Sequence, residues 1–329
     1  MPVLDASSFA IGFDPRDREA LHRLWDEVID SQQWTEGRLT ERFEEAWERW
    51  NGIGAVATAG WSGAALAALD YAGVRGQTVL CPSNTFPATP LAAMAAGAEV
   101  EFVDCNRHDL CASFESFEQQ ALRHKPRAAF VVHIGGHIAF DIERIADFCR
   151  DQGIFLIEDC AHAHGAEWNG RRPGSFGDAG LYSLYATKTI STGEGGIIVS
   201  HDADLLEHAR AYRNYGKPDF AVKGLGQRMS EFTAALGLVE VERLPEIVRW
   251  KNEAARELDE SHPSRLELPD GMTSGLYKYI VFDPIERSTG KVYDQPCHRL
   301  FGHHGDELPN SDWVAKNHWC VPLYYRPGS

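Results

Sequence analysis

Short apolar runs alternate with amphipathic segments through the middle of the chain. The apolar runs predict buried strands over residues 55–57, 78–81, 99–104, 128–133, 154–157, 179–185 and 197–199. The segments between them carry apolar residues at helical spacing and predict helices over residues 64–71, 87–96, 113–124, 141–152 and 202–212. Strands and helices that alternate in this way form right-handed crossovers. The sequence therefore predicts an α/β fold with a mostly parallel sheet that helices cover on both faces.

The two ends of the chain follow other patterns. Residues 15–50 carry apolar positions at helical spacing and predict two amphipathic helices. A helix with a wide apolar face is predicted over residues 230–244, ending before Pro245. Beyond it the chain becomes charged and then strand-like at residues 277–282. We expect two domains: a large one over residues 1–240 and a small α+β one over residues 241–329.

Composition and charge narrow the class of protein. The formal net charge of −16 argues against nucleic-acid binding, because a phosphate backbone would be repelled. No apolar run approaches the roughly 20 residues that a membrane helix needs, and the N-terminus lacks a signal-peptide pattern. The seven cysteines are scattered and lack zinc-finger spacing, so they indicate reduced core thiols of a cytoplasmic protein.

Lys188 follows a predicted strand directly and opens a Gly-rich turn of small hydroxylic residues. Residues 183–196 read SLYATKTISTGEGG. A lysine between two core strands ordinarily reaches into solvent, because lysine is almost never buried without a partner. Small side chains that exclude bulk and supply hydroxyl groups instead suit a bound phosphate and a Schiff base on the lysine amine. This segment favours a cofactor-binding lysine, and a solvent-exposed lysine is the alternative.

Asp159 lies just past the predicted strand 154–157. An acid at the carboxyl end of a strand stands where open α/β sheets bind their ligands. A carboxylate there can pair with the pyridinium nitrogen of pyridoxal phosphate and keep it protonated, so that the ring acts as an electron sink. The alternative is an acid that caps the next helix.

A short strand, a glycine-bearing turn and a helix also follow one another within residues 55–71. The turn contains Gly60, Trp61 and Ser62. Free N–H groups at the start of a helix point toward a bound anion, so this order of elements predicts a phosphate site.

Five longer sequence blocks occur in a fixed order. They are PSNTFPAT (82–89), GAEVEFVDCN (97–106), IEDCAHAHGA (157–166), the lysine segment (183–196) and GQRMSEFTAALGLVEVERL (226–244). In these blocks the chain resembles the DegT-type sugar aminotransferases, which are pyridoxal phosphate enzymes of the aspartate aminotransferase superfamily (fold type I). The resemblance covers roughly residues 35–250, and blocks of this length are far more specific than one short motif.

The resemblance implies a seven-stranded sheet and an amino transfer, with glutamate as the donor and a nucleotide-linked keto-sugar as the acceptor. Lys188 would bond the cofactor and then move the proton, and Asp159 would hold the ring nitrogen protonated. Tyr185 would face the substrate. Arg228 would reach the phosphate or substrate bound to the other subunit of a homodimer, so that the active sites are shared.

The resemblance also implies which residues hold pyridoxal phosphate. Phe86 would pack on the ring, and His162 would lie on it or beside it. Gly60, Trp61, Ser62 and Ser183 would take the phosphate.

The sequence departs from the family pattern at several positions, so two alternative functions remain. Trp61 stands where the family has glycine, and Gly226 stands where it has asparagine. The terminal segment NHWCVPLYYRPGS (317–329) resembles the family's strand before a closing helix, and the family usually carries further residues after it, so the small domain is expected to be shorter than usual. These departures favour, to a small degree, a catalytically idle, cofactor-binding partner subunit. A sugar dehydratase on the same scaffold is the other alternative, but such relatives have histidine in place of Lys188.

Four histidines near the C-terminal end raise the question of a metal site: His298, His303, His304 and His318. Their spacing gives no helical ligand pair, and no acidic cluster joins them. We therefore expect solvated loop histidines and no metal.

Overall fold

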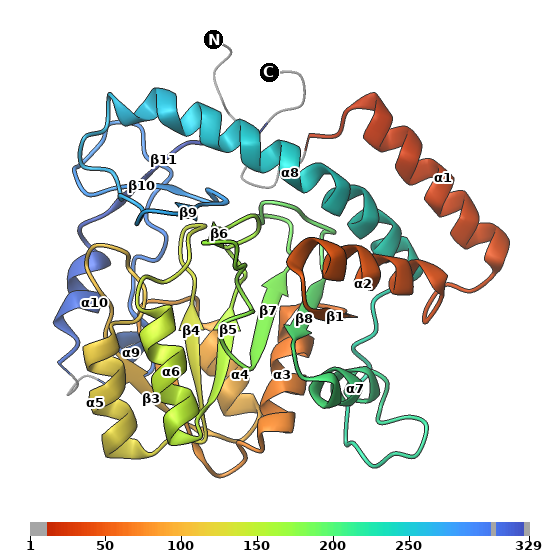
Figure 1. The fold of residues 1–329 in the computed structure, drawn as a ribbon, viewed down its shortest axis with the longest axis horizontal. Helices are drawn as coiled ribbons and strands as arrows, with labels where there is room; N and C mark the ends of the chain where they lie inside the picture. The colour runs from red at the N-terminus through yellow and green to blue at the C-terminus, as the bar shows by residue number, and fades with distance from the viewer. Residues whose placement is uncertain (1–11, 304–306, 326–329) are drawn as a thin grey trace.

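A seven-stranded sheet forms the centre of the computed structural model, which describes residues 12–303 and 307–325 (Figure 1). Its strands lie in the order β1-β8-β7-β5-β4-β2-β3. Their bounds are β1 Gly54–Thr58, β2 Thr78–Pro82, β3 Glu99–Val103, β4 Ala128–Val132, β5 Phe155–Asp159, β7 Ala179–Ser183 and β8 Gly196–Ser200. Strand β8 is antiparallel to both its neighbours, and the other pairs are parallel. The predicted α/β fold with a mostly parallel sheet is confirmed.

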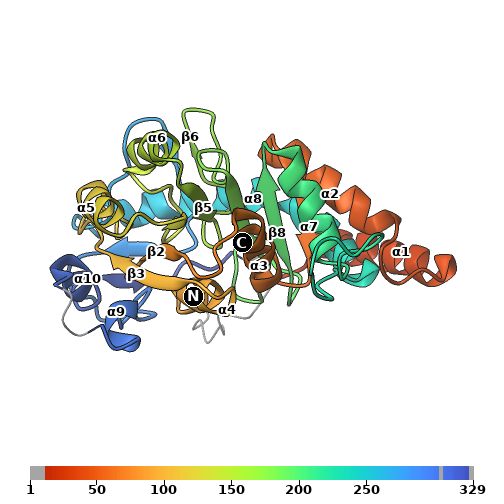
Figure 2. The same ribbon diagram turned by 90° about the horizontal axis from the view of Figure 1, so that it is seen from below.

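Helices cover both faces of this sheet, as Figure 2 shows. One face packs against α3 (Trp61–Ala72), α4 (Ala88–Ala95) and α7 (Ala203–Tyr212). The other face packs against α5 (Phe114–His124) and α6 (Ile142–Gln152), and near β1 against α2 (Arg38–Asn51). Helix α8 (Glu231–Asp259) packs on α2, and α1 (Pro15–Ser31) packs on α8.

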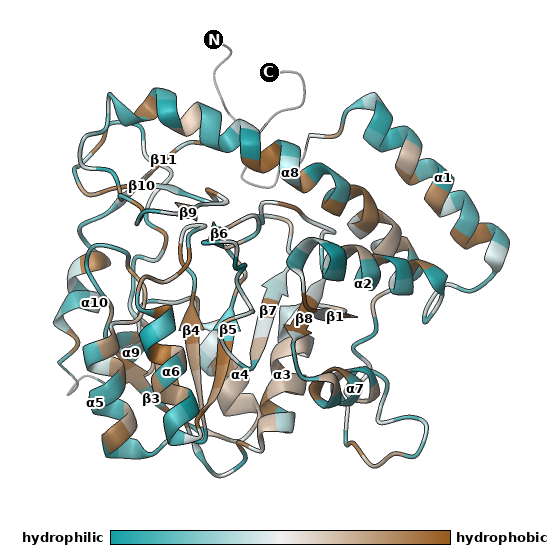
Figure 3. Ribbon diagram, viewed as in Figure 1, coloured by the Kyte–Doolittle hydropathy of each residue, from teal (hydrophilic) through white to brown (hydrophobic). Residues whose placement is uncertain are grey.

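The strands are apolar on both faces because both faces are covered. In β2, for example, Val79 and Cys81 face α3 and α4, whereas Leu80 faces α5, since successive side chains of a strand point to opposite sides. The helices carry hydrophobic residues toward the sheet and hydrophilic ones outward (Figure 3). This difference explains why continuous apolar runs predicted the strands and periodic patterns predicted the helices.

Helix α8 does not end before Pro245, so that prediction was wrong. It runs from Glu231 to Asp259 with Pro245 inside it. A proline within a helix removes one hydrogen bond and costs about 3 kcal/mol. Leu244 and Ile247, on either side of it, are buried in one apolar cluster with α1 and α2. Their burial, at roughly 1.5–3 kcal/mol for each side chain, offsets the cost, so the helix continues.

The chain after α8 returns to the large sheet's core. It forms β9 (Met272–Thr273), β10 (Tyr279–Val281), α9 (Cys297–Leu300), α10 (Pro309–Val314) and β11 (Trp319–Val321). Strand β10 pairs with β11, and β9 pairs with β6 (Glu167–Trp168). Ile280 and Cys320 share an apolar cluster with β4 and α6. The division into domains at residue 240 stays a prediction.

Several further expectations meet the structure here. All seven cysteines are free and buried. Among the described residues, no helix combines the length and apolarity needed to cross a membrane. The expectation of solvated histidines was wrong for His298 and His318, which are fully buried. His298 contacts the hydroxyl group of Ser83, and His318 accepts a hydrogen bond from the amide of Val292, because α9 and α10 pack against the sheet. His303 is partly exposed, and His304 lies outside the described residues.

Candidate active site

A cavity of about 710 Å³ opens where the carboxyl ends of β1, β2, β5 and β7 meet. Nine of the ten predicted site residues line it: Gly60, Trp61, Ser62, Phe86, Asp159, His162, Ser183, Tyr185 and Lys188. Arg228 is not part of its lining. Ligands of open α/β sheets bind at this edge, so the fold itself brings these distant segments together.

Asp159 is the last residue of β5 and is 6% exposed. Its Oδ1 accepts hydrogen bonds from the amide of Ala161 at 3.0 Å and from the indole N–H of Trp61 at 3.2 Å. Its Oδ2 accepts one from the hydroxyl group of Thr89 at 3.0 Å. Burial raises the pKa of Asp159, and these donors, together with the nearby charge of Lys188, oppose that rise.

Lys188 lies in the turn after β7, where its amide donates to the carbonyl of Tyr185 at 2.9 Å. Burial lowers the pKa of Lys188 to about 8; the carboxylate of Asp159 opposes this change, and the charge of Lys278 adds to it. A lysine with this pKa is partly neutral near pH 8, so its amine can act as a nucleophile and as a base. Lys188 is only partly exposed and lines the cavity, and its role as the cofactor-binding lysine stays a prediction.

The start of α3 has the features of an anion site. Its first N–H groups have no partner within the helix, and Gly60 caps it without a side chain. Ser62 is exposed toward the cavity. Ser183, which also lines it, is the buried last residue of β7. A Cβ atom on Gly196 would stand 2.4 Å from the carbonyl carbon of Gly60. Only glycine at position 196 lets the start of β8 lie this close to the turn at Gly60.

Aromatic rings border the cavity. Phe86 lines the cavity and is 61% exposed. His162 is buried and stacks on Tyr277, with 4.1 Å between ring centroids. Burial holds the pKa of His162 well below its usual value, so the imidazole is neutral. Its Nδ1 has no hydrogen-bond partner within the described part of the chain, which leaves one polar atom for a ligand.

Sequence reasoning missed several residues of this cavity, and they fall into two groups. Thr89, which holds Asp159, lies inside one of the matching blocks, and its place three residues after Phe86 was the available signal. The others come from two C-terminal segments that no matching block covers: Tyr277 and Lys278 at the predicted strand 277–282, and Lys291 and Tyr293 before α9.

Arg228 lies in a separate polar cluster before α8. Its guanidinium donates to Asn214 Oδ1 at 2.6 Å and lies 3.9 Å from Glu36. Its side chain is 27% exposed. Next to it, a Cβ atom on Gly226 would stand 2.4 Å from the hydroxyl oxygen of Tyr215, so a larger residue there requires Tyr215 to move. The predicted contact of Arg228 with another subunit's site stays a prediction.

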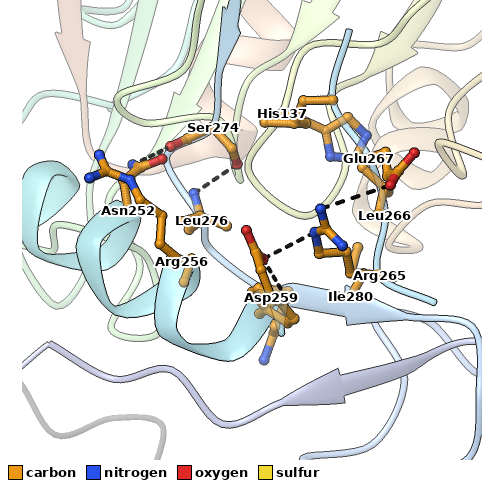
Figure 4. A pocket seen from close by; sticks show the side chains of 14 residues that line it. His137, Asn252, Arg256, Asp259, Arg265, Leu266, Glu267, Ser274, Leu276 and Ile280 are labelled. Carbon is orange, nitrogen blue, oxygen red and sulfur yellow. Dashed lines mark hydrogen bonds and ion pairs between the residues drawn. The ribbon is translucent and has the colours of Figure 1, made fainter. Parts of the chain in front are cut away.

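A second cavity, of about 380 Å³, lies between α8 and β10 (Figure 4). The charged groups that it contains largely pair with one another. Arg265 lies 3.1 Å from Asp259 and 3.8 Å from Glu267, and Tyr279 donates to Asp259 at 2.7 Å. Nine of the ten predicted site residues lie in the larger cavity instead.

Two buried groups of potential metal ligands also occur, around His137 and around His133. In the second group the carboxylate of Glu158 already accepts from His133 and from the amides of Gly174, Phe176 and Gly177, at 2.6–2.8 Å. These contacts occupy the four acceptor positions of a carboxylate, so Glu158 serves the backbone of residues 174–177.

The residues of the large cavity fit pyridoxal phosphate, the cofactor that the resemblance implies. The amine of Lys188, with its lowered pKa, is a partner for an aldehyde, and Oδ2 of Asp159 keeps an acceptor position for a ring N–H. The start of α3 offers amides to a phosphate. The orphaned Nδ1 of His162 offers a further polar contact.

Comparisons with known proteins identify the family of the chain. Residues 15–267 match the DegT/DnrJ/EryC1/StrS aminotransferase family. The chain is 31% identical over 308 residues to the GDP-perosamine synthase of Escherichia coli O157:H7, a match that covers 91% of this chain and 82% of that protein. It is 32% identical over 285 residues to the dTDP-4-dehydro-2,3,6-trideoxy-D-glucose 4-aminotransferase of Saccharopolyspora spinosa, covering 76% and 74%. The solved structure of DesI in the presence of its TDP-sugar product superposes with a TM-score of 0.81 at 29% identity, covering 93% of this chain and 85% of that one. The chain belongs to the DegT/DnrJ/EryC1/StrS aminotransferase family.

Proposed function

We propose that the protein is a pyridoxal phosphate-dependent aminotransferase that moves an amino group from glutamate to a nucleotide-linked keto-sugar, in amino-sugar biosynthesis. The observation that carries the proposal is that Lys188 and Asp159 line one cavity in a chain of this family. The nucleotide is inferred from the relatives, whose names contain GDP- and dTDP-linked sugars. Two lysines besides Lys188 line the cavity, Lys278 and Lys291, and both suit an acidic substrate.

The cofactor would supply an electron-withdrawing ring that accepts the electron pair of the donor's Cα–H bond. Lys188 would take the proton from Cα and return it on the other side of the transferred nitrogen, since its pKa of about 8 suits a group that gains and loses a proton near neutral pH. Asp159 would keep a proton on the ring nitrogen by pairing a buried negative charge with it.

The remaining residues of the cavity would bind and orient. Phe86 and His162 would pack against the ring, and Tyr185 would face the sugar. The phosphate would be held by the amides after Gly60 and by the two hydroxyl groups of Ser62 and Ser183, because unpaired amides and hydroxyl groups replace its water shell.

We further propose a cytoplasmic homodimer with shared active sites. Three large apolar side chains of the cavity lining are exposed in the single chain: Phe86 by 61%, Leu300 by 45% and Tyr185 by 40%. A second copy would cover them, and its Arg228 would add a cation to the phosphate or substrate. The free, buried cysteines are typical of proteins from reducing compartments.

The test is the product formed with labelled donor. The protein, loaded with pyridoxal phosphate, is incubated with 15N-glutamate and a panel of nucleotide keto-sugars, with glutamine as a second donor. We expect 15N in one sugar product and 2-oxoglutarate in equal amount. A dehydrated sugar without nitrogen would indicate the dehydratase, and a cofactor absorbance unchanged by any donor would indicate an idle partner subunit.

A further inference from the structure

Trp61 occupies the first position of α3, in the turn that the resemblance aligns with a glycine of the family. Its side chain does not point into solvent. The residue is 8% exposed and belongs to the apolar cluster between the sheet and helices α3, α4 and α7. Its indole N–H donates to Oδ1 of Asp159 at 3.2 Å, although the two residues are 98 positions apart. The departure from the family pattern therefore has a specific contact in the cavity.

The hydrogen bonds of Asp159 distinguish its two oxygens. Oδ1 accepts from Trp61 and from the amide of Ala161, whereas Oδ2 accepts from the hydroxyl group of Thr89. A carboxylate has about two acceptor positions on each oxygen. Oδ1 is thus fully used, and Oδ2 keeps one position.

The hydrogen-bond donors also influence whether the carboxyl group of Asp159 is ionised. An indole N–H and a peptide N–H only donate, so both favour the ionised form of Asp159. The Thr89 hydroxyl group contacts Thr85 at 3.1 Å, and if Thr85 donates in that contact, the Thr89 proton is free for Asp159. The other ionisable groups that face Asp159 are Lys188, whose charge also favours the carboxylate, and Tyr293.

We propose that Trp61 is a positioning residue for the cofactor: its indole N–H fixes Oδ1 of Asp159, so that Oδ2 is the oxygen left to hold the proton of the ring nitrogen. The proposal rests on the proposed function in so far as the cofactor is pyridoxal phosphate. A single extra donor on a buried carboxylate matters because hydrogen bonds to charged groups are about twice as strong as those between neutral groups.

The opposite role is also testable. If the indole instead occupied space or an acceptor position that the cofactor needs, its removal would strengthen cofactor binding. The two roles predict changes of opposite sign in the same measurement.

The test compares Trp61→Phe, which keeps an aromatic ring and removes the N–H group, with Trp168→Phe. Trp168 also donates its indole N–H, to the carbonyl of Asp270 at 3.2 Å, but lies outside the cavity. We expect the dissociation constant of pyridoxal phosphate to rise about tenfold in Trp61→Phe, the loss of one hydrogen bond to a charged group, and to stay unchanged in Trp168→Phe.

A second readout is independent of catalysis. The holoenzyme is prepared with cofactor labelled with 15N at the ring nitrogen, and its NMR shift reports whether that nitrogen is protonated. We expect a protonated nitrogen in the wild type and a shift toward the neutral form in Trp61→Phe. In an Asp159→Ala background, Trp61→Phe should cause no further loss of affinity, because Trp61 acts through Asp159.

An unchanged affinity and an unchanged 15N shift in Trp61→Phe, or equal losses with and without Asp159, would overturn the inference while leaving the proposed function standing. Tighter binding would show the blocking role instead and would also overturn it. If Trp61→Phe does not fold, Trp61→Gly carries the same expectations, since glycine is the family's residue there. A wild type that binds no pyridoxal phosphate would overturn the proposed function and this inference with it.

Discussion

The ammonium group of Lys188 lies 5.1 Å from the centroid of the Tyr277 ring. The ammonium group of Lys278 lies 5.2 Å from the same centroid, and His162 stacks on the ring at 4.1 Å. One aromatic side chain from the C-terminal part thus contacts the residues that the proposed function assigns to the proton and to the cofactor ring. Cation–π contacts of this kind are worth about 0.5–2 kcal/mol.

Tyr277→Leu should weaken the site more than Tyr277→Phe. Leucine removes the cation–π contacts and the stacking with His162, so we expect a loss of about 1–2 kcal/mol in the free energy of unfolding and a slower amino transfer. Phenylalanine removes only the hydroxyl contact with Thr187 at 3.3 Å and should behave nearly like the wild type. Urea unfolding and single-turnover rates check this. Equal behaviour of the two variants would show that the ring is only a spacer.

Asp159→Asn should keep the cofactor bound and slow the amino transfer by several orders of magnitude. The amide has nearly the shape of the carboxylate, but it is neutral and cannot hold a proton on the ring nitrogen. The half-reaction with glutamate, followed by stopped-flow absorbance, measures the rate. A rate close to that of the wild type would mean that the carboxylate only supports the structure.

Lys251 makes the stability of the protein depend on pH. It is 6% exposed and donates to the carbonyl of Leu276 at 2.9 Å. Burial, followed by the charge of Lys278, lowers the pKa of Lys251 from 10.5 to about 7. The unfolded chain therefore binds more protons between pH 7 and 10.5, and stability from this group rises with pH in that window.

The measurement is the difference in unfolding free energy between the wild type and Lys251→Met at pH 7 and pH 9. We expect the wild type to gain roughly 2 kcal/mol on the variant between these two values, since each pH unit of a full proton difference is worth about 1.4 kcal/mol. Lys316→Met, at an exposed position, is the control and should show no such gain. A difference that does not change with pH would mean that Lys251 keeps an ordinary pKa.

The sequence predicted the part of the site that lies at strand ends. Asp159 is the last residue of β5 and Lys188 lies in the turn after β7, and the carboxyl ends of these parallel strands meet at one edge of the sheet. Glu158 precedes Asp159, and nothing in the local pattern separates the two acids. The two acids differ in the direction of their side chains. Glu158 accepts hydrogen bonds from buried backbone amides on the other side of β5.

The rest depends on tertiary packing that no local pattern encodes. Tyr277 and Tyr293 reach the cavity because the chain returns to the sheet after α8, and short elements such as α9 leave no clear periodicity. We predicted that the helix ends before Pro245, because proline breaks helices. Burial of the apolar residues on both sides of Pro245 offsets the cost of the proline, so the helix continues. Arg228 depends on another subunit, so its role requires an experiment.

Complementation tests the shared active site. Lys188→Ala subunits are mixed with Arg228→Ala subunits, each inactive alone on the proposed account. If each site takes Lys188 from one subunit and Arg228 from the other, both substitutions of a mixed dimer fall on the same site. The other site then stays intact. Half of the dimers are mixed at random and each has one of two sites intact, so activity should return to about a quarter of the wild type. Mixtures that stay inactive, or a monomer by sedimentation, would contradict the shared site.

The identity of the cofactor-binding lysine tests the account most directly. The protein, loaded with pyridoxal phosphate, is reduced with borohydride, digested and mapped by mass spectrometry, beside a Lys188→Ala variant whose fold is checked by circular dichroism. Lys188 lines the same cavity as Asp159, and its pKa is lowered to about 8, so we predict a pyridoxyl group on Lys188 in the wild type and none in the variant. A pyridoxyl group on any other lysine of the wild type, or an unchanged label in the folded variant, would contradict the account.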